Sequence, residues 1–318
     1  MLLYGHTKKE GFEYRMDRQN INVCVSCDDN YSKYAGVLIT SILYNAAEDD
    51  KLSIYILDGG ISQEKKEQIL SLKSIKDCNI NFIQINPELF SQYAKVKTHN
   101  YISIATYYRL KLAQLLPDID KIIYLDCDMV VNTSLKKLFN ADLHENPIAG
   151  VLDARVKHKK KWKNSGYINA GMILFDLKKI REGQIENIFY EYTKANIRLI
   201  KTGDQDIINF SLKNKIEILP DTWNVQVSGF ASRTSFEKNP SIIHYIGSDK
   251  PWIYASNTFF KDFYFKYLDL TPWKLTDAEK VIWLDENKKA SRKRFWKRRS
   301  LCFLNPKYWY AFYRSYIV

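Results

Sequence analysis

The chain has 318 residues, of which 46% are hydrophobic, so it can bury one large core, or one core with a small appendage. No stretch approaches the roughly 18 uninterrupted apolar residues of a membrane-spanning helix, and residues 1–20 lack the apolar run of a secretory signal, so we expect a cytoplasmic protein. The five cysteines are an odd number scattered along a long chain, which argues against a disulfide framework.

The formal net charge of +12 is concentrated at one end of the chain. Residues 287–318 contain ten Lys or Arg and no Asp or Glu, and subtracting these ten from +12 leaves +2 for residues 1–286. The body of the protein is therefore nearly balanced. The charge gives no reason to expect a nucleic-acid-binding surface outside the tail.

Short β-branched runs alternate with amphipathic stretches, which is typical of an α/β domain with a mostly parallel sheet covered by helices. Strands are predicted at 21–27, 52–57, 80–85, 121–125, 148–152, 171–175, 217–219 and 242–245. Helical segments are predicted at 34–44, 63–72, 103–116, 185–197 and 204–212. The first three strands and the helices between them form two consecutive βαβ units.

The pattern changes after about residue 262 to helical, aromatic and finally strongly basic segments. We therefore predict an N-terminal extension at 1–20, a main domain at 21–265 and a C-terminal appendage at 266–318.

The sharpest chemical signal is the pair Asp126 and Asp128, which flanks Cys127 at the end of the apolar strand 121–125. Strand alternation predicts both carboxylates on one side and Cys127 on the other. Two ionised carboxylates repel each other unless a positive charge lies between them, and oxygen ligands suit Mg²⁺ or Mn²⁺. Ligands of open α/β sheets collect at the carboxyl ends of strands, which favours a metal site here over a solvated acidic turn.

A second polar group, Asp28-Asp-Asn-Tyr31, follows the first predicted strand. Asp28 and Asn30 can hydrogen-bond a base or ribose and Tyr31 can stack on a ring, although an Asp-Asn helix cap is an equally good explanation. The chain contains neither Gly-x-Gly-x-x-Gly nor Gly-x-x-x-x-Gly-Lys, so dinucleotide and P-loop sites lose their main support.

His244 lies inside the predicted strand 242–245 and is followed by Gly247 and Lys250. A lone strand histidine is more often a satisfied core group than a metal ligand. With Gly247 admitting close approach and Lys250 neutralising phosphate, His244 could instead complete the cation site. Cys24 and Cys27 are three residues apart on one strand and point to opposite faces, so we expect them to pack rather than to share a metal.

Taken together, these residues resemble glycosyltransferase family 8, in particular its bacterial lipopolysaccharide and lipooligosaccharide galactosyl- and glucosyltransferases. The resemblance covers roughly residues 21–265. Its segments occur in the family's order: Asp28-Asp-Asn-Tyr31, Leu57-Asp-Gly-Gly-Ile-Ser62, Ser103-Ile-Ala-Thr-Tyr-Tyr-Arg-Leu110, Tyr124-Leu-Asp-Cys-Asp128, Ile168-Asn-Ala-Gly171, Asp204-Gln-Asp206 and His244-Tyr-Ile-Gly-Ser-Asp-Lys-Pro-Trp252.

The resemblance implies a GT-A fold, an α/β fold with a mixed, mostly parallel sheet flanked by helices, here with a small helical, basic C-terminal appendage. It also implies a UDP-sugar donor, a Mn²⁺ or Mg²⁺ cofactor and retention of anomeric configuration. The family's metal ligands match Asp126, Asp128 and His244. Its uridine-contacting segment matches Asp28, Asn30 and Tyr31, and positions near the diphosphate match Gly247 and Lys250. Positions around the donor sugar match Arg109, Asn169, Asp204 and Gln205.

Gln205 lies where the family places a group near the reacting anomeric carbon. Retaining glycosidases usually supply a carboxylate nucleophile, whereas the matched position here is an amide. We therefore expect same-face attack by the acceptor hydroxyl, with the departing phosphate as base, rather than a covalent intermediate. The neighbouring Asp206 is interpreted as a helix-start residue.

The tail interleaves basic and aromatic residues, a composition that suits an anionic bilayer surface. They are Lys288, Lys289, Arg292, Lys293, Arg294, Phe295, Trp296, Lys297, Arg298, Arg299, Phe303, Trp309, Phe312, Tyr313 and Tyr316. RNA is a competing partner, and a solvated terminal helix without a partner is a further alternative. Because the family modifies lipid-linked glycans, we expect peripheral attachment to the inner face of the cytoplasmic membrane and no nucleic-acid partner.

The sequence thus predicts a retaining hexosyltransferase that moves galactose or glucose from a UDP-sugar to a hydroxyl of a lipopolysaccharide or lipooligosaccharide core acceptor. Two alternatives keep the fold: an enzyme that glycosylates a protein or soluble glycan, and an inactive nucleotide-sugar-binding protein. The lysine-rich segment 155–163 departs from the family motifs and is interpreted as an acceptor-side loop.

Overall fold

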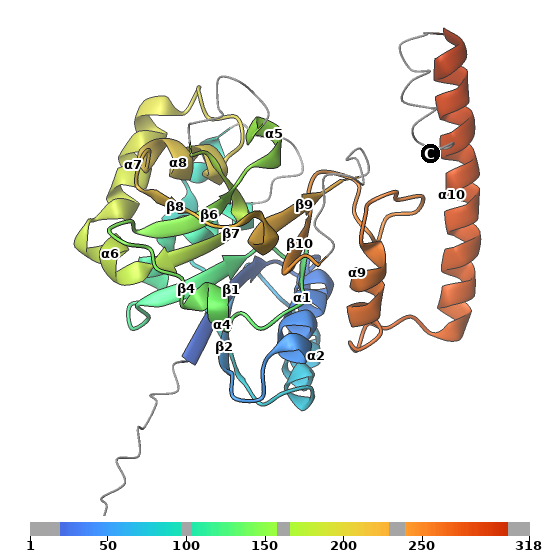
Figure 1. Cartoon of the computed structure of the whole chain (residues 1–318), viewed down its shortest axis with the longest axis horizontal. Coiled ribbons are helices and arrows are strands. Elements are labelled where there is room, and N and C mark those ends of the chain that lie inside the picture. Colours follow the sequence, from blue (N-terminus) through green and yellow to red (C-terminus); the bar gives the residue numbers. More distant parts are fainter. Residues whose placement is uncertain (1–19, 97–103, 158–165, 229–238, 305–318) are drawn as a thin grey trace, which may run out of the picture.

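The computed structural model describes residues 20–96, 104–157, 166–228 and 239–304. Its centre is a seven-stranded sheet in the order β3-β2-β1-β4-β7-β6-β8, with helices on both faces (Figure 1). The strands of this sheet are β1 Asn20–Cys27, β2 Lys51–Asp58, β3 Asn79–Gln84, β4 Lys121–Leu125, β6 Ile148–Leu152, β7 Ile168–Asp176 and β8 Ile216–Ile218. The prediction of a helix-covered α/β sheet is confirmed.

The α-helices are α1 Ser32–Asn45, α2 Gln63–Leu70, α3 Leu112–Leu115, α4 Lys136–Phe139, α5 Ala154–Lys157, α6 Leu177–Glu182, α7 Ile185–Asn196, α8 Asp204–Ser211, α9 Lys261–Leu268 and α10 Asp277–Leu304. Short 3₁₀ helices are η1 Ser71–Ser74, η2 Pro87–Phe90, η3 Tyr93–Lys95, η4 Ile104–Lys111 and η5 Asp221–Asn224. The helix expected at 103–116 is divided into η4 and α3, because the backbone leaves the helical region at Lys111, where φ is −126°.

Strand direction in the large sheet is mixed and mostly parallel, as predicted. β1 pairs in parallel with β2 and β4, β2 with β3, and β6 with β8, whereas β7 runs antiparallel to both β4 and β6. The parallel strands are apolar on both faces because helices cover both, which is why they form continuous β-branched runs in the sequence. Their carboxyl ends meet at one edge of the sheet.

Two hydrophobic clusters cover the two faces of this sheet. One contains Leu38 and Ile39 of α1 with Cys27, and the other contains Ile207 of α8 with Cys24. The two cysteines of β1 therefore lie on opposite sides and are both buried, which confirms that they pack separately.

A second, three-stranded sheet, which the sequence analysis missed in part, lies beside the first. It has the order β5-β10-β9, with β5 Met129–Val131, β9 Val225–Val227 and β10 Ile242–Tyr245. Antiparallel pairing of β5 with β10 places His244 opposite Met129, the residue after Asp128. This pairing brings two segments more than a hundred residues apart to one point.

The C-terminal helices continue from the second sheet. Helix α9 spans the predicted boundary between residues 265 and 266, and its Tyr264, Tyr267 and Leu268 are buried in a cluster with Val37 and Tyr245. Helix α10 lies beside α9, on the side away from the large sheet (Figure 1). In the described ranges, none of the helices combines the length and the apolar composition that crossing a bilayer requires. Residues 1–19 and 305–318, which include most of the predicted extension and the end of the tail, lie outside the described residues.

Candidate functional site

A cavity of about 470 Å³ lies at the carboxyl ends of β1 and β4. It is lined by all of the predicted site residues except Asn30: Asp28, Tyr31, Arg109, Asp126, Asp128, Asn169, Asp204, Gln205, His244, Gly247 and Lys250. Asn30 is exposed on the turn that precedes α1. The resemblance therefore identified residues from six separate chain segments that meet at one place.

Asp126 and Asp128 lie in the turn between β4 and β5. The prediction that they alternate along a strand is wrong, because β4 ends at Leu125 and residues 127 and 128 form a turn. Their carboxylates nevertheless converge with the His244 imidazole, and one ligand atom from each lies within 4.8 Å of the others. Cys127 between them is buried, and its thiol donates to the Ser26 carbonyl at 3.2 Å.

The chemistry of this cluster fits a divalent cation. Among the described residues, none donates a hydrogen bond to the buried Oδ1 atom of Asp128, which lies 3.3 Å from Nε2 of His244. Burial alone would raise the pKa of the Asp128 carboxyl, but the Lys250 ammonium and His244 hold it well below its ordinary value. Two carboxylates and one imidazole form a mixed oxygen and nitrogen ligand set that Mn²⁺ accepts.

His244 is oriented by Asn224, a residue that the sequence analysis missed. The Nδ1 atom of His244 lies 3.1 Å from the Oδ1 atom of Asn224, and Nδ2 of Asn224 donates to the Oδ1 atom of Asn169 at 3.0 Å. A chain of two hydrogen bonds therefore links a candidate metal ligand to a residue predicted near the donor sugar. No sequence signal identifies Asn224, since its role depends on the pairing of β9 with β10.

Arg109 lies under the acidic cluster with only 2% of its surface exposed. Its Nη2 atom is 2.6 Å from Oδ1 of Asp126, and its Nε atom is 3.0 Å from Oδ2 of Asp204. The guanidinium also donates to the Ala170 carbonyl and stacks 4.1 Å from the centre of the Tyr124 ring. Burial raises the pKa of Asp204 to about 6, and the positive charge of Arg109 opposes this rise.

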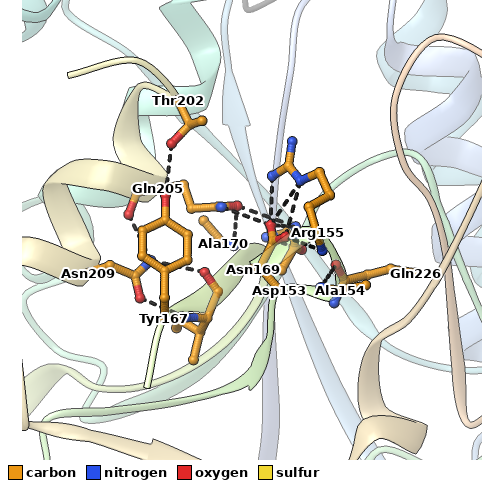
Figure 2. A network of polar contacts seen from close by, with 12 residues as sticks. Asp153, Ala154, Arg155, Tyr167, Asn169, Ala170, Thr202, Gln205, Asn209 and Gln226 are labelled. Carbon is orange, nitrogen blue, oxygen red and sulfur yellow. Dashed lines mark hydrogen bonds and ion pairs between the residues drawn. The ribbon is translucent and has the colours of Figure 1, made fainter. Parts of the chain in front are cut away.

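Gln205 is held by a polar network around Asp153 (Figure 2). Its Nε2 atom donates to Oδ2 of Asp153 at 2.9 Å, and its Oε1 atom accepts from the Ala170 amide at 3.1 Å. Asp153 is fully buried and is also paired with Arg155 at 2.6 Å. Asp153 is not among the predicted site residues, although it directly follows a predicted strand, as Asp126 does.

The predicted nucleotide side of the cavity combines structural and accessible groups. Oδ1 of Asp28 accepts from the Tyr31 amide at 3.0 Å, so this carboxylate caps the turn while lining the cavity. The Lys250 ammonium contacts Asp128 and the Tyr245 carbonyl. Gly247 has φ of +73°, and no atom of the described residues lies within 4 Å of an added Cβ, so the described part of the chain leaves this backbone open to close approach.

Comparison with known proteins agrees with the resemblance found in the sequence. The sequence profile of the family described as Glycosyl transferase family 8 matches residues 22–256. A putative glycosyltransferase of Haemophilus influenzae is 34% identical over 253 residues, which are 74% of this chain and 73% of that protein. A lipopolysaccharide 1,2-glucosyltransferase of Escherichia coli K12 is 27% identical, over 86% of this chain and 87% of that one.

Among solved structures, the galactosyltransferase LgtC in complex with donor and acceptor sugar analogs is similar to this chain. The TM-score is 0.71 at 27% identity, and the match covers 84% of this chain and all of that one. The predicted GT-A fold is thereby confirmed.

Proposed function

Because the chain belongs to glycosyltransferase family 8, and is therefore a glycosyltransferase, we propose that it moves galactose or glucose from a UDP-sugar to a glycan hydroxyl. We further propose that the acceptor is the core of lipopolysaccharide or lipooligosaccharide and that the anomeric configuration is retained. Similarity to the lipopolysaccharide 1,2-glucosyltransferase and to LgtC supports the acceptor class and both hexoses.

The observation that carries the proposal is the meeting of Asp126, Asp128 and His244 beside Lys250 in one cavity. These three residues would hold Mn²⁺ or Mg²⁺, which supplies positive charge for the diphosphate leaving group. Lys250 reaches the same place with an ammonium that can bind a phosphate oxygen. We assign Asp28, Asn30 and Tyr31 to the uridine and Gly247 to the approach of the diphosphate.

On the sugar side, we assign Arg109, Asn169, Asp204 and Gln205 to positioning the hexose. Gln205 has both amide atoms engaged, one by Asp153 and one by the Ala170 amide, and an amide is a poor nucleophile. Asp153 is committed to Arg155 and Gln205. These contacts support same-face attack by the acceptor hydroxyl, whose proton passes to the departing phosphate, rather than a covalent glycosyl-enzyme.

Helix α10 supports a proposal of membrane attachment. Its first turns expose Val281, Ile282 and Leu284, and its later turns carry Trp296 among basic residues. Each Lys or Arg near an anionic bilayer contributes about 1 kcal/mol to binding, and exposed apolar side chains can enter the interface. We propose that the enzyme binds peripherally to the inner face of the cytoplasmic membrane and binds no nucleic acid.

The test is a measurement of UDP release from UDP-galactose and UDP-glucose, with Mn²⁺ or EDTA, and with or without a truncated lipooligosaccharide. We expect Mn²⁺-dependent release that the acceptor accelerates and that disappears in Asp128→Ala. Asp118→Ala, which removes an exposed carboxylate outside the cavity, serves as control and should behave as wild type.

Other outcomes identify the alternatives. Release that only a protein or a soluble glycan accelerates would replace the acceptor class but keep the transferase. Tight UDP binding without turnover of either donor would instead identify a nucleotide-sugar-binding protein.

A further inference from the structure

We propose that Asn287 and Arg294 of α10 hold the segment 247–257 in the position that places Lys250 in the cavity, so that donor affinity depends on this helix. The inference rests on the proposed function, because it assigns α10 a role in donor binding. It gives part of the basic tail a second task besides membrane attachment.

Asn287 and Arg294 both hydrogen-bond to the backbone of Ala255. Oδ1 of Asn287 accepts a hydrogen bond from the Ala255 amide at 2.7 Å, and the Arg294 guanidinium donates to the Ala255 carbonyl. Arg294 also lies 3.6 Å from Oδ2 of Asp249. Asn287 and Arg294 are about two helical turns apart and so lie on one face of α10.

Segment 247–257 forms one wall of the cavity, to which it contributes Gly247, Lys250, Trp252 and Ile253. Lys250 and Trp252 lie between the two points that Arg294 contacts. Trp252 stacks on Tyr34 of α1, with ring centres 4.0 Å apart, so the inner side of the segment rests on the main domain. Helix α10 secures its outer side.

Ala255 needs its hydrogen bonds to α10 because its backbone conformation is energetically unfavourable. It has φ of +58°, in the left-handed region that residues with a Cβ rarely adopt. Such a conformation persists when the surroundings over-determine it, and here both backbone polar groups of Ala255 are bound by α10. Without these bonds we expect the segment to leave this conformation for part of the time.

Arg294 differs from the basic residues next to it in the sequence. It is only 26% exposed and faces Ala255 and Asp249, whereas Arg292 and Lys293 are exposed. Trp283 of α10 adds aromatic contacts. The centre of its ring lies 6.0 Å from the ring centre of Tyr254 in the segment and 5.0 Å from that of Phe265 in α9. Helix α10 therefore packs against segment 247–257 through both polar and aromatic contacts.

The expected changes in donor KM and kcat follow from how much of the time segment 247–257 holds Lys250 in the cavity. In a variant that lacks a contact with α10, the segment holds its donor-binding position only part of the time. The apparent dissociation constant of the donor then rises by the inverse of that fraction. A saturating donor concentration draws the segment back to its donor-binding position, so kcat should change little. A role confined to stability would instead lower the melting temperature and leave the donor KM unchanged.

The experiment measures acceptor-free and lipid-free UDP-sugar hydrolysis by the full chain with Mn²⁺, at varied donor concentration. We expect Asn287→Ala and Arg294→Ala each to raise the donor KM about 5- to 20-fold with kcat within about twofold of wild type. Arg294→Lys, which keeps the charge but reaches only one partner, should give an intermediate KM. Arg198→Ala, an exposed arginine of the main domain, should leave both constants unchanged.

A double-mutant cycle with Asp249→Asn tests the contact itself. The rise in KM in the double variant Asp249→Asn/Arg294→Ala should be no larger than that of Arg294→Ala alone. Donor KM values within twofold of wild type in both alanine variants, or an equal rise in Arg198→Ala, would overturn the proposal while wild-type turnover still supports the enzyme. Absence of turnover and of UDP binding in wild type would overturn the proposed function itself.

Discussion

The Nδ1 atom of His244 lies 3.1 Å from the Oδ1 atom of Asn224, and this contact determines which imidazole nitrogen faces Asp128. An amide oxygen only accepts hydrogen bonds, so Nδ1 carries a proton, and Nε2 is the nitrogen that faces the acidic cluster and would bind a cation there. Asn224 is 2% exposed and is itself fixed by its bond to Asn169. Metal-binding histidines are commonly oriented by a partner of this kind.

Replacing Asn224 should therefore weaken the metal site without unfolding the protein. We expect Asn224→Ala to lower Mn²⁺ affinity about 10- to 100-fold, because the imidazole loses the partner that fixes its tautomer and orientation. The measurement is the binding of Mn²⁺ in the presence of UDP, followed by electron paramagnetic resonance of the free ion. Asn187→Ala, an exposed asparagine of α7, is the control, and an affinity equal to wild type in Asn224→Ala would contradict the assignment.

Asp153 should affect turnover through Gln205. In Asp153→Asn the Gln205 Nε2 atom loses a charged acceptor, so one of the two contacts that orient the Gln205 amide is weakened. We expect kcat for donor hydrolysis to fall about 10- to 100-fold with donor KM within a few fold of wild type, as for an interaction needed mainly in the transition state. The exposed Asp142→Asn should be neutral in the same assay.

The sequence was sufficient to predict the large sheet and most of the cavity. Strands β4, β6 and β10 have the predicted bounds, because each is a short, mostly apolar run, and β4 and β6 end directly before an aspartate. Family motifs then placed Asp126, Asp204 and His244 at one site, which strand patterns alone could not do.

The features that escaped prediction depend on contacts distant in the sequence. Strands β5 and β9 have three residues each, too few for an alternation pattern, yet their pairing with β10 brings His244 to Asp128. The charge pattern assigned Arg294 to the membrane surface with its neighbours, because sequence cannot show that one arginine of a basic helix faces Asp249. Folding of α9 across residue 266 likewise depends on burial of its tyrosines.

Gly171 should be required for metal binding because no side chain fits beside the cluster. A Cβ at this position would lie 2.4 Å from Cε1 of His244 and 2.9 Å from Oδ2 of Asp126. We expect Gly171→Ala to displace both groups and to lower Mn²⁺ affinity by more than about 10-fold. Gly150→Ala is the matched control on strand β6, since its Cβ would collide with Ile168 instead, and it should lower stability but keep the metal. Equal Mn²⁺ affinity in both variants would show that the space beside Gly171 is adaptable.

Arg109 should be a major determinant of stability as well as of the site. Arg109→Met keeps an unbranched side chain but leaves the buried Asp204 carboxylate and its neighbour Asp126 without their cation. Removing one partner of a buried ion pair costs about 3–5 kcal/mol, so we expect a loss of that size in the free energy of unfolding. Urea denaturation checks this, with the exposed Arg198→Met as control. A loss below about 1 kcal/mol would mean that protonation of Asp204 or entry of water compensates.

Glu186 in α7 links stability to pH at a place away from the cavity. Burial raises the pKa of its carboxyl above the ordinary value, although the carboxylate accepts hydrogen bonds from the amides of Ala113, at 2.8 Å, and Gln114, at 3.2 Å. A raised folded-state pKa means that folding favours the protonated carboxyl. The stability that protonation provides is complete below the unfolded-state pKa and is lost as pH rises through the folded-state pKa.

Glutamine imitates the protonated form at every pH, because it is neutral and its Oε1 can still accept from both amides. Glu186→Gln should therefore unfold at higher urea concentration than wild type at about pH 7, and this advantage should vanish near pH 4. Glu182→Gln, at an exposed position that precedes α7, should show no such pH-dependent gain. A loss of stability in Glu186→Gln at pH 7 would mean that the charge-assisted bonds to Ala113 and Gln114 outweigh desolvation, so that folding lowers the pKa of Glu186 instead of raising it.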